Sequence, residues 1–436
     1  MDSIAMALAR YSFVLLVTVI GLASGARAQP PEAASPRQTQ ADDYTSYELL
    51  APERQQFRIL YDVSATTAGA RVFLNPIRPG SEASDERITD LATGQPLRFV
   101  VVSGTEARTL GLPNAAADAQ YLKVDLARPV PPGGEQRLRI DKTYKDAASY
   151  RREGDDIVFA RSLGIRRNKV VLPAGYEVVA CNTPVQVFTE ADGRIALSFV
   201  NIQPGQVALE LRARALPAGT KVAPRPAAPR EAEGTAGPAA RVPSLAASAA
   251  AAVNDRAFQD REITYWLQPP DTHAFDISHD YTESRVGIDR YVNVVRGGSR
   301  VSKPGATALD TGEVLPVETL RGEAITKAGV EIGAPVAADS EAVVIRFPAV
   351  KAGQSTRLRI TETYTDPSRY GIVDGTLIWR RSFGRPRNVM VLPEGWFVTA
   401  SSVPAVIDRD EQGRVRLSYV NPRNDEIDVL VRAAKR

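Results

Sequence analysis

The sequence predicts an all-β protein made of two tandem antiparallel β-sandwich domains. Three observations support this: the chain contains an internal duplication, apolar and polar residues alternate along short segments, and Gly, Pro or Asp turns separate these segments. Alternation with a period of two is typical of half-buried strands. Many short strands of this kind favour a sandwich over a parallel sheet.

The duplication covers most of the chain. Residues 46–94 align with residues 264–312 at a shift of 218, and 16 of 49 pairs are identical. Residues 137–201 align with residues 357–421 at a shift of 220, and 26 of 65 pairs are identical. A period of about 220 residues is that of a whole domain, so the repeat unit is a domain and not a solenoid element.

These alignments place domain 1 at residues 43–215 and domain 2 at residues 255–436. Residues 216–254 are rich in Pro and Ala and contain few large apolar residues, which predicts a linker. Residues 29–42 have a similar composition and predict a disordered leader. The two domains would then be joined by a flexible tether.

Residues 1–28 have the features of a secretory signal peptide. Arg10 precedes the apolar run YSFVLLVTVIGLA, which is shorter than the about 20 residues of a transmembrane helix. Ala26 and Ala28 provide the pattern of small residues that signal peptidase recognises, so we expect cleavage after Ala28. The mature protein is therefore expected in the periplasm or outside the cell, without a transmembrane segment.

Composition and motifs exclude several functions. The 54 basic and 51 acidic residues leave a net charge of +3, so no binding to nucleic acid is expected. His273, His279 and Cys181 are the only residues of their types, and the sequence has no HExxH, CxxC or GxSxG motif. We therefore expect no metal, no cofactor and no nucleophilic catalytic residue.

One phrase occurs twice, as RSLGIRRNKVVLPAGY at residues 161–176 and as RSFGRPRNVMVLPEGW at residues 381–396. Its simplest interpretation is strand–turn–strand–turn, in which Gly164 and Gly384 give the backbone the freedom to turn. A functional interpretation is also open, because clustered arginines can bind phosphate or carboxylate. Aromatic residues at Tyr150/Tyr370, Phe159/Trp379 and Tyr176/Trp396 could alternatively form a glycan platform.

Arg161 and Arg381 occupy an apolar-face position in both copies. A buried guanidinium is costly unless it is paired and hydrogen-bonded. We expect a partner among the acids that both repeats share, Asp146/Asp366 or Asp62/Asp280, with the guanidinium lying across Phe159/Trp379. The alternative is a sheet-edge position with the charged end in water. Together, the candidate binding residues are Arg161, Arg167, Asn168, Arg381, Arg387, Asn388, Trp379 and Trp396.

The segments RRNKVVLPAGYEVVACNTP and PRNVMVLPEGWFVTASSVP resemble the strand–LPxG–strand runs in amino-terminal β domains of exported zinc aminopeptidases. They are also similar to uncharacterised exported bacterial proteins with tandem β domains. The zinc-binding helix of the aminopeptidases has no counterpart in this sequence, so the resemblance implies only a β fold.

These features favour a non-catalytic exported protein that binds or scaffolds a component of the bacterial cell envelope. The expected partner is a glycan, an anionic polymer or a protein, and two tethered domains would suit bivalent binding. The alternative is a carbohydrate-active or other hydrolase that uses a carboxylate pair.

Overall fold

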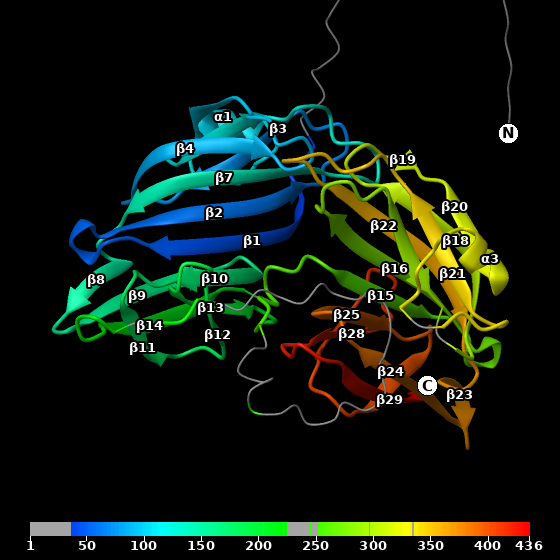
Figure 1. The fold of residues 1–436 in the computed structure, drawn as a ribbon. Coiled ribbons are helices and arrows are strands. Elements are labelled where there is room, and N and C mark those ends of the chain that lie inside the picture. Colours follow the sequence, from blue (N-terminus) through cyan, green and yellow to red (C-terminus); the bar gives the residue numbers. More distant parts are fainter. Residues whose placement is uncertain are drawn as a thin grey trace, which may run out of the picture. The chain divides into compact units, whose positions relative to one another are not determined.

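The computed structural model describes residues 36–203, 205–220, 222–224, 245, 252–295, 297–333 and 335–436. The expected signal peptide and most of the expected linker lie outside these residues. Strands dominate the described residues, which confirms the predicted all-β fold (Figure 1). No helix in the described ranges is long and apolar enough to cross a membrane.

Repeat 1 (residues 36–220) contains three sheets among its described residues. The large sheet has the order β12 (Gln186–Thr189), β13 (Ile195–Val200), β10 (Arg167–Val171), β1 (Gln40–Leu49), β2 (Gln56–Ala65), β7 (Gln136–Lys145) and β4 (Glu82–Asp90). The second sheet has the order β11 (Tyr176–Cys181), β14 (Val207–Ala215), β9 (Asp156–Leu163) and β8 (Tyr150–Glu153). The third sheet has the order β3 (Val72–Ile77), β6 (Gln120–Asp125) and β5 (Phe99–Ser103).

Repeat 2 (residues 252–436) has the same three-sheet plan in its described part. Its large sheet has the order β19 (Glu313–Val314), β18 (Arg300–Ala308), β22 (Thr356–Thr365), β16 (Ala274–Glu283), β15 (Glu262–Leu267), β25 (Arg387–Val391), β28 (Val415–Val420) and β27 (Val406–Arg409). The second sheet has the order β23 (Tyr370–Val373), β24 (Thr376–Phe383), β29 (Ile427–Lys435) and β26 (Trp396–Ser401). The third has the order β17 (Arg290–Val294), β21 (Glu341–Arg346) and β20 (Val317–Arg321).

The large sheet of each repeat packs on its second sheet and forms a sandwich. Phe57 of β2 and Phe159 of β9 are almost fully buried, and their ring centroids lie 5.3 Å apart. The equivalent contact in repeat 2 joins Phe275 of β16 to Trp379 of β24 at 6.5 Å. The core side chains alternate along their strands as the sequence pattern predicts, because successive strand residues face opposite sides.

Each large sheet departs from the antiparallel prediction at one pair of strands. β1 runs parallel to β10, and β15 runs parallel to β25. Short hairpins can join only antiparallel neighbours, whereas these parallel partners are separated by more than 100 residues of intervening chain. Alternation within a strand therefore gave no information about this pairing.

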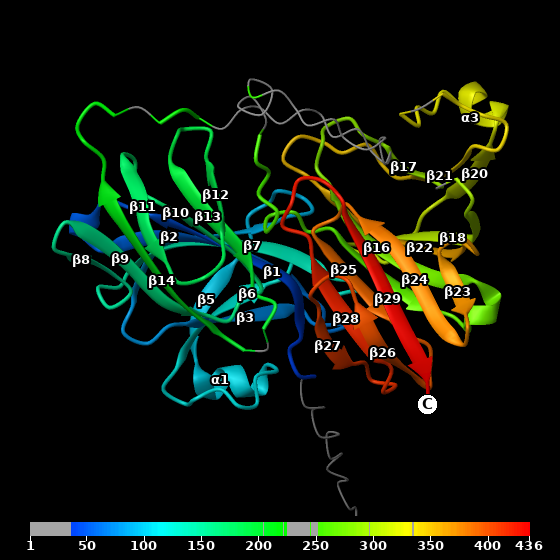
Figure 2. The same cartoon turned by 90° about the horizontal axis from the view of Figure 1, so that it is seen from below.

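Short helical elements lie beside the third sheet of each repeat and between the first two strands of each large sheet. α1 (Gly104–Thr109) follows β5 and packs beside the third sheet of repeat 1, and α3 (Glu323–Lys327) does so in repeat 2 (Figure 2). The 3-10 turns η1 (Pro52–Arg54) and η2 (Pro270–Thr272) connect the first two strands of each large sheet.

The chain begins its first strand earlier than the composition predicts. Residues 40–42, which we assigned to a disordered leader, form the start of β1, where Gln40 pairs with Ala65 of β2. The side chain of Gln38 donates to the Leu74 carbonyl and accepts from the Leu74 amide at 3.0 and 2.8 Å. Polar hydrogen bonds therefore order residues that bury little apolar surface.

Arg161 and Arg381 form the buried ion pairs that the sequence suggested. Arg161 Nη1 lies 3.1 Å from Asp146 Oδ2, and Arg381 Nη1 lies 3.7 Å from Asp366 Oδ2. Arg161 lies over Tyr47, Phe57 and Tyr144, and Arg381 over their counterparts in repeat 2. The expected stacking on Phe159/Trp379 is wrong, because these rings stand on the same strand as the arginines and all four side chains extend toward the opposite sheet.

The other shared acids have different partners, and the turn glycines differ from the prediction. Asp62 and Asp280 bind Arg139 and Arg359 on adjacent strands. Gly164 and Gly384 do not have positive φ angles, whereas Gly175 and Gly395, in the second turn of the phrase, have φ values of 78° and 80°. The left-handed conformation that favours glycine is therefore needed in the LPxG turn and not in the first turn.

Candidate functional site

The two repeats meet at buried charges, and Asp42 is their common point. A β-bulge between Ala41 and Tyr44 interrupts the pairing of β1 with β2, and Asp42 has a φ of 50° there. Its carboxylate lies 3.2 Å from Arg167 Nη2 of its own repeat. It also lies 2.6 Å from Arg387 Nη2 and 2.7 Å from Arg357 Nη2, both from repeat 2. One carboxylate therefore joins the repeats.

The charges around Asp42 reflect the duplication. Asp42 and Asp260 are 218 positions apart, which is the shift between the repeats here. Arg357 binds both carboxylates, at 2.7 and 2.6 Å. Arg137, the counterpart of Arg357, binds Asp310 of repeat 2 with two hydrogen bonds of 2.7 and 2.8 Å. We call Asp42, Asp260, Arg167, Arg357 and Arg387 the inter-repeat ion cluster.

Burial and charge act in opposite directions in this cluster. Burial raises the pKa of Asp42, but the charges of Arg167, Arg387 and Arg357 outweigh it and hold that pKa well below its usual range. Burial lowers the pKa of Arg357, but the carboxylates of Asp42 and Asp260 outweigh it and raise that pKa. The charges that oppose the effect of burial on Asp42 and Arg357 therefore come from both repeats.

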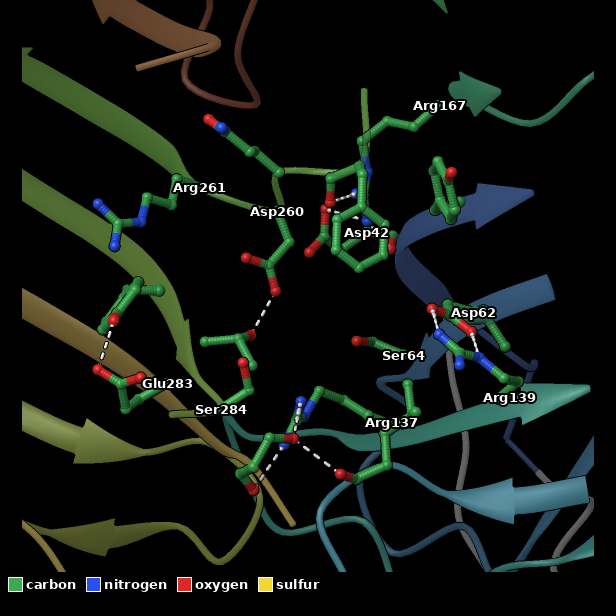
Figure 3. Close-up of a pocket in the computed structure, with 18 of the residues that line it drawn as sticks. Asp42, Asp62, Ser64, Arg137, Arg139, Arg167, Asp260, Arg261, Glu283 and Ser284 are labelled. Atoms are coloured by element: carbon green, nitrogen blue, oxygen red, sulfur yellow. Dashed lines mark hydrogen bonds and ion pairs between the residues drawn. The ribbon is translucent and has the colours of Figure 1, made fainter. Parts of the chain in front are cut away.

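A cavity of about 490 Å³ lies beside the cluster and is lined by both repeats. Figure 3 shows Asp42, Asp62, Arg137 and Arg139 from repeat 1, facing residues that include Asp260, Arg261 and Glu283 from repeat 2. We call this space the inter-repeat cavity.

Aromatic side chains form the apolar part of its lining. Phe258 is 54% exposed and contacts the ring of Tyr44 edge to face, with centroids 5.4 Å apart. The guanidinium of Arg261 lies 4.1 Å from the ring centroid of Tyr281. Arg167 fixes the position of Phe258, because its Nη1 donates to the Phe258 carbonyl at 3.0 Å.

A second cavity, of about 480 Å³, lies at the positions related to the first by the duplication. Asp280 and Arg359 replace Asp62 and Arg139, and Glu262 stands where the first cavity has Tyr44. The two cavities therefore differ in chemistry: the first has aromatic walls, whereas the second is lined mainly by paired charges.

The eight residues that the sequence singled out do not form an exposed anion-binding loop. Arg167 and Arg387 are buried in the ion cluster, and the anion that they share is Asp42 of this same chain. Asn168 and Asn388 are buried and donate to the carbonyls of Ile165 and Arg385, which closes the turn. Arg161 and Arg381 form the buried pairs described above.

The proposed aromatic residues also lie largely inside the protein. Trp379 is fully buried in the core, and Trp396 is 7% exposed. Trp396 lines a surface cavity that belongs to repeat 2 and is separate from the inter-repeat cavity.

Sequence reasoning missed Asp42, Asp260 and Phe258. Asp42 and Asp260 obey the 218-residue shift, so an alignment extended four residues toward the N-terminus would have paired them. Asp310 has Ala92 as its counterpart, so the duplication carried no signal for it. No group of three or more His, Cys, Asp and Glu side chains within the described ranges is arranged to hold a metal ion.

The chain matches no protein-family model and no curated protein. Among solved structures, it is similar to an M1 zinc metallopeptidase from Deinococcus radiodurans, with 15% identity and a TM-score of 0.28 over 41% of this chain and 42% of that one. It is also similar to an aminopeptidase N family protein from Idiomarina loihiensis, with 10% identity and a TM-score of 0.24 over 39% of this chain and 29% of that one.

A putative protease from Parabacteroides distasonis matches over 92% of this chain and 94% of its own, with 11% identity and a TM-score of 0.23. The matched regions thus make up less than half of each of the two aminopeptidase-type chains. At these TM-scores, the similarity carries no argument about function.

Proposed function

We propose that the protein is a non-catalytic exported binding protein of the bacterial cell envelope and that the inter-repeat cavity is its ligand site. The observation that carries this proposal is a cavity of about 490 Å³ lined by both repeats. Its volume falls in the range of about 300–1,000 Å³ that is typical of small-molecule sites. Because both repeats line it, occupancy and the docking of the repeats are linked.

The charges of the cavity favour binding over acid catalysis. A general acid needs a raised pKa. The pKa of Glu283 is instead lowered, because hydrogen bonds from Arg285 and Tyr281 outweigh the effect of burial, which raises it. The pKa of Asp42 is also lowered. The second cavity differs in this respect, because burial raises the pKa of Glu135 there.

The geometry also changes the binding mode that the sequence suggested. Residues 36–436 form one compact unit, and ion pairs join the two repeats. The two cavities have different walls, so they are not two copies of one site. We therefore propose one shared site in place of bivalent binding by tethered domains.

The ligand class follows from the lining. Most charged side chains of the cavity are already paired within the protein, as Arg139 is with Asp62 and Arg285 with Glu283. A highly charged ligand would have to break these pairs. The site therefore suits a small envelope molecule with an apolar or planar face and a few polar groups.

Photocrosslinking from Phe258 tests the site. We expect a benzoylphenylalanine placed at position 258 to form an adduct with an envelope component in cells, because this side chain is exposed and lines the cavity. The measurement is mass spectrometry of the purified adduct.

The same probe at Phe397, which is 40% exposed and does not line the cavity, is the matched control. No adduct at position 258, or the same adduct at both positions, would contradict the assignment.

The chain from the periplasmic or extracellular fraction is expected to begin at Gln29. The reason is the predicted cleavage after Ala28. Intact-mass measurement and N-terminal sequencing check this. An Ala28→Leu variant is expected to keep the precursor mass, and a native chain that begins at Met1 would exclude this export route.

A further inference from the structure

A groove on repeat 2 combines an outward-facing tryptophan with rows of polar side chains. Trp266 lies on β15 between the buried Tyr265 and Leu267, so its side chain faces away from the core. It lines two adjacent cavities, of about 950 and 430 Å³. Trp396, Pro269, Pro270 and Pro393 line the larger one.

Polar residues continue the groove along the same sheet face. Opposite Trp266 on β16 stands Asp276, and the next pairs on this face are Thr264 with Ser278 and Glu262 with Asp280. At about 3.3 Å per residue, the four steps from Trp266 to Glu262 extend about 13 Å. Gln268, Gln412, Arg414 and Lys435 stand around the other end. The groove therefore offers an aromatic face at one place and hydrogen-bonding groups along its length.

The duplication shows that this surface is not required by the fold. Glu48 occupies the position of Trp266 in repeat 1, and it lies 3.8 Å from Arg58 and 3.9 Å from Arg194. Arg152 occupies the position of Ile372 and pairs with Glu53 at 2.6 Å. Ion pairs thus cover the region in repeat 1, whereas repeat 2 has a half-buried indole and an exposed aliphatic side chain there.

We infer that this groove binds an extended glycan chain. Sugar rings present apolar faces that stack on aromatic side chains, and their hydroxyls match short polar side chains that can both donate and accept. Thr264, Ser278 and Thr361 all line the groove and supply such hydroxyls. The inference deepens the proposed envelope binding, on which the choice of an envelope glycan rests, but it concerns a different surface from the inter-repeat cavity.

Tryptophan fluorescence of the mature protein gives the first test. The protein has three tryptophans, of which Trp379 is fully buried, whereas Trp266 and Trp396 line the groove and report on it. Cellotetraose, chitotetraose and glycan strands released from purified peptidoglycan are the probes. We expect a saturable change in emission with at least one of them. No change with any of the three at millimolar concentration would overturn the inference.

Calorimetric titration of variants gives the second test. Trp266→Glu introduces the residue of repeat 1 and is expected to weaken glycan binding about tenfold, because it removes the stacking face. Trp266→Tyr is expected to stay within about threefold of the wild type, since it keeps an aromatic face. Glu48→Gln, at the matching position of repeat 1, is expected to change nothing.

Equal affinity of the wild type and Trp266→Glu would overturn the groove assignment, and so would a loss on Glu48→Gln. Trp266 faces outward, so these variants are expected to remain folded, which their unfolding temperatures check. Glycan binding without a Phe258 adduct would reject the inter-repeat site alone, whereas a Phe258 adduct without glycan binding would reject the groove alone.

Discussion

Replacing Asp42 with Asn is expected to lower the free energy of unfolding by about 3–5 kcal/mol at neutral pH. The substitution removes the charge that Arg167, Arg357 and Arg387 share and leaves these buried guanidinium groups without it. Asn has nearly the same shape as Asp and tolerates the positive φ of 50° at this position. The loss should therefore come from charge and not from backbone strain.

Urea unfolding followed by circular dichroism measures this effect. The neighbouring Asp43→Asn is the matched control, because the hydrogen bond to Asp43 is a long one of 3.3 Å from Gln40. We expect Asp43→Asn to stay within about 0.5 kcal/mol of the wild type. A loss of similar size in both variants would show that Asp42 does not join the repeats.

A double-mutant cycle separates the ion cluster from a general packing defect. Removing Arg387 in the Asp42→Asn background should cost less than removing it from the wild type, because its carboxylate partner is already absent. Since the pKa of Asp42 is lowered in the folded state, its contribution is present above its ordinary value of 3.8 and is lost as the pH falls toward the folded value. The variant and the wild type should therefore converge in strong acid.

Replacing Glu362 with Gln is expected to stabilise the protein by about 3 kcal/mol at pH 8. Burial raises the pKa of Glu362 from 4.5 to about 7, and at about 1.4 kcal/mol per pKa unit this is a penalty of about 3 kcal/mol on the ionised form. Its carboxylate accepts hydrogen bonds from Asn293 Nδ2 at 2.9 and 2.7 Å. Gln can accept from the same amide, so the substitution removes the buried charge and keeps a partner.

The sign of the pH dependence follows from the direction of this shift. Because the folded pKa is the higher one, the contribution of Glu362 to stability is complete below pH 4.5 and is lost as the pH rises through about 7. The Gln variant should thus match the wild type near pH 4 and exceed it at pH 8. Unfolding free energies across this range check the prediction, with the exposed Glu331→Gln as control.

A parallel pH profile of the Gln variant and the wild type would contradict this account. Repeat 1 carries Lys142 at the corresponding position, where Nζ donates to Asn75 Oδ1 at 2.9 Å. Asn75 thus accepts from a cation in repeat 1, whereas its counterpart Asn293 donates to a carboxylate in repeat 2. The asymmetry is consistent with divergence of the two repeats after duplication.

The sequence by itself determined the two β-sandwich repeats and the partners available to Arg161. These features are local or repeated: alternation shows within ten residues which side of a strand is buried, and a shared acid can be identified by its counterpart 220 positions away. The sequence did not predict the parallel pairs of β1 with β10 and of β15 with β25, because periodicity within a strand does not specify which strand lies beside it.

Only the tertiary structure decided which carboxylate pairs with Arg167 and Arg387 and where a ligand could bind. Asp42 and Arg387 are 345 residues apart, and their contact depends on how one repeat docks on the other. Trp266 and Glu48 occupy equivalent positions in the sequence, yet one lines an open groove and the other lies among ion pairs. Alternation shows that such a side chain faces outward, but its surroundings depend on strands and turns from distant parts of the chain.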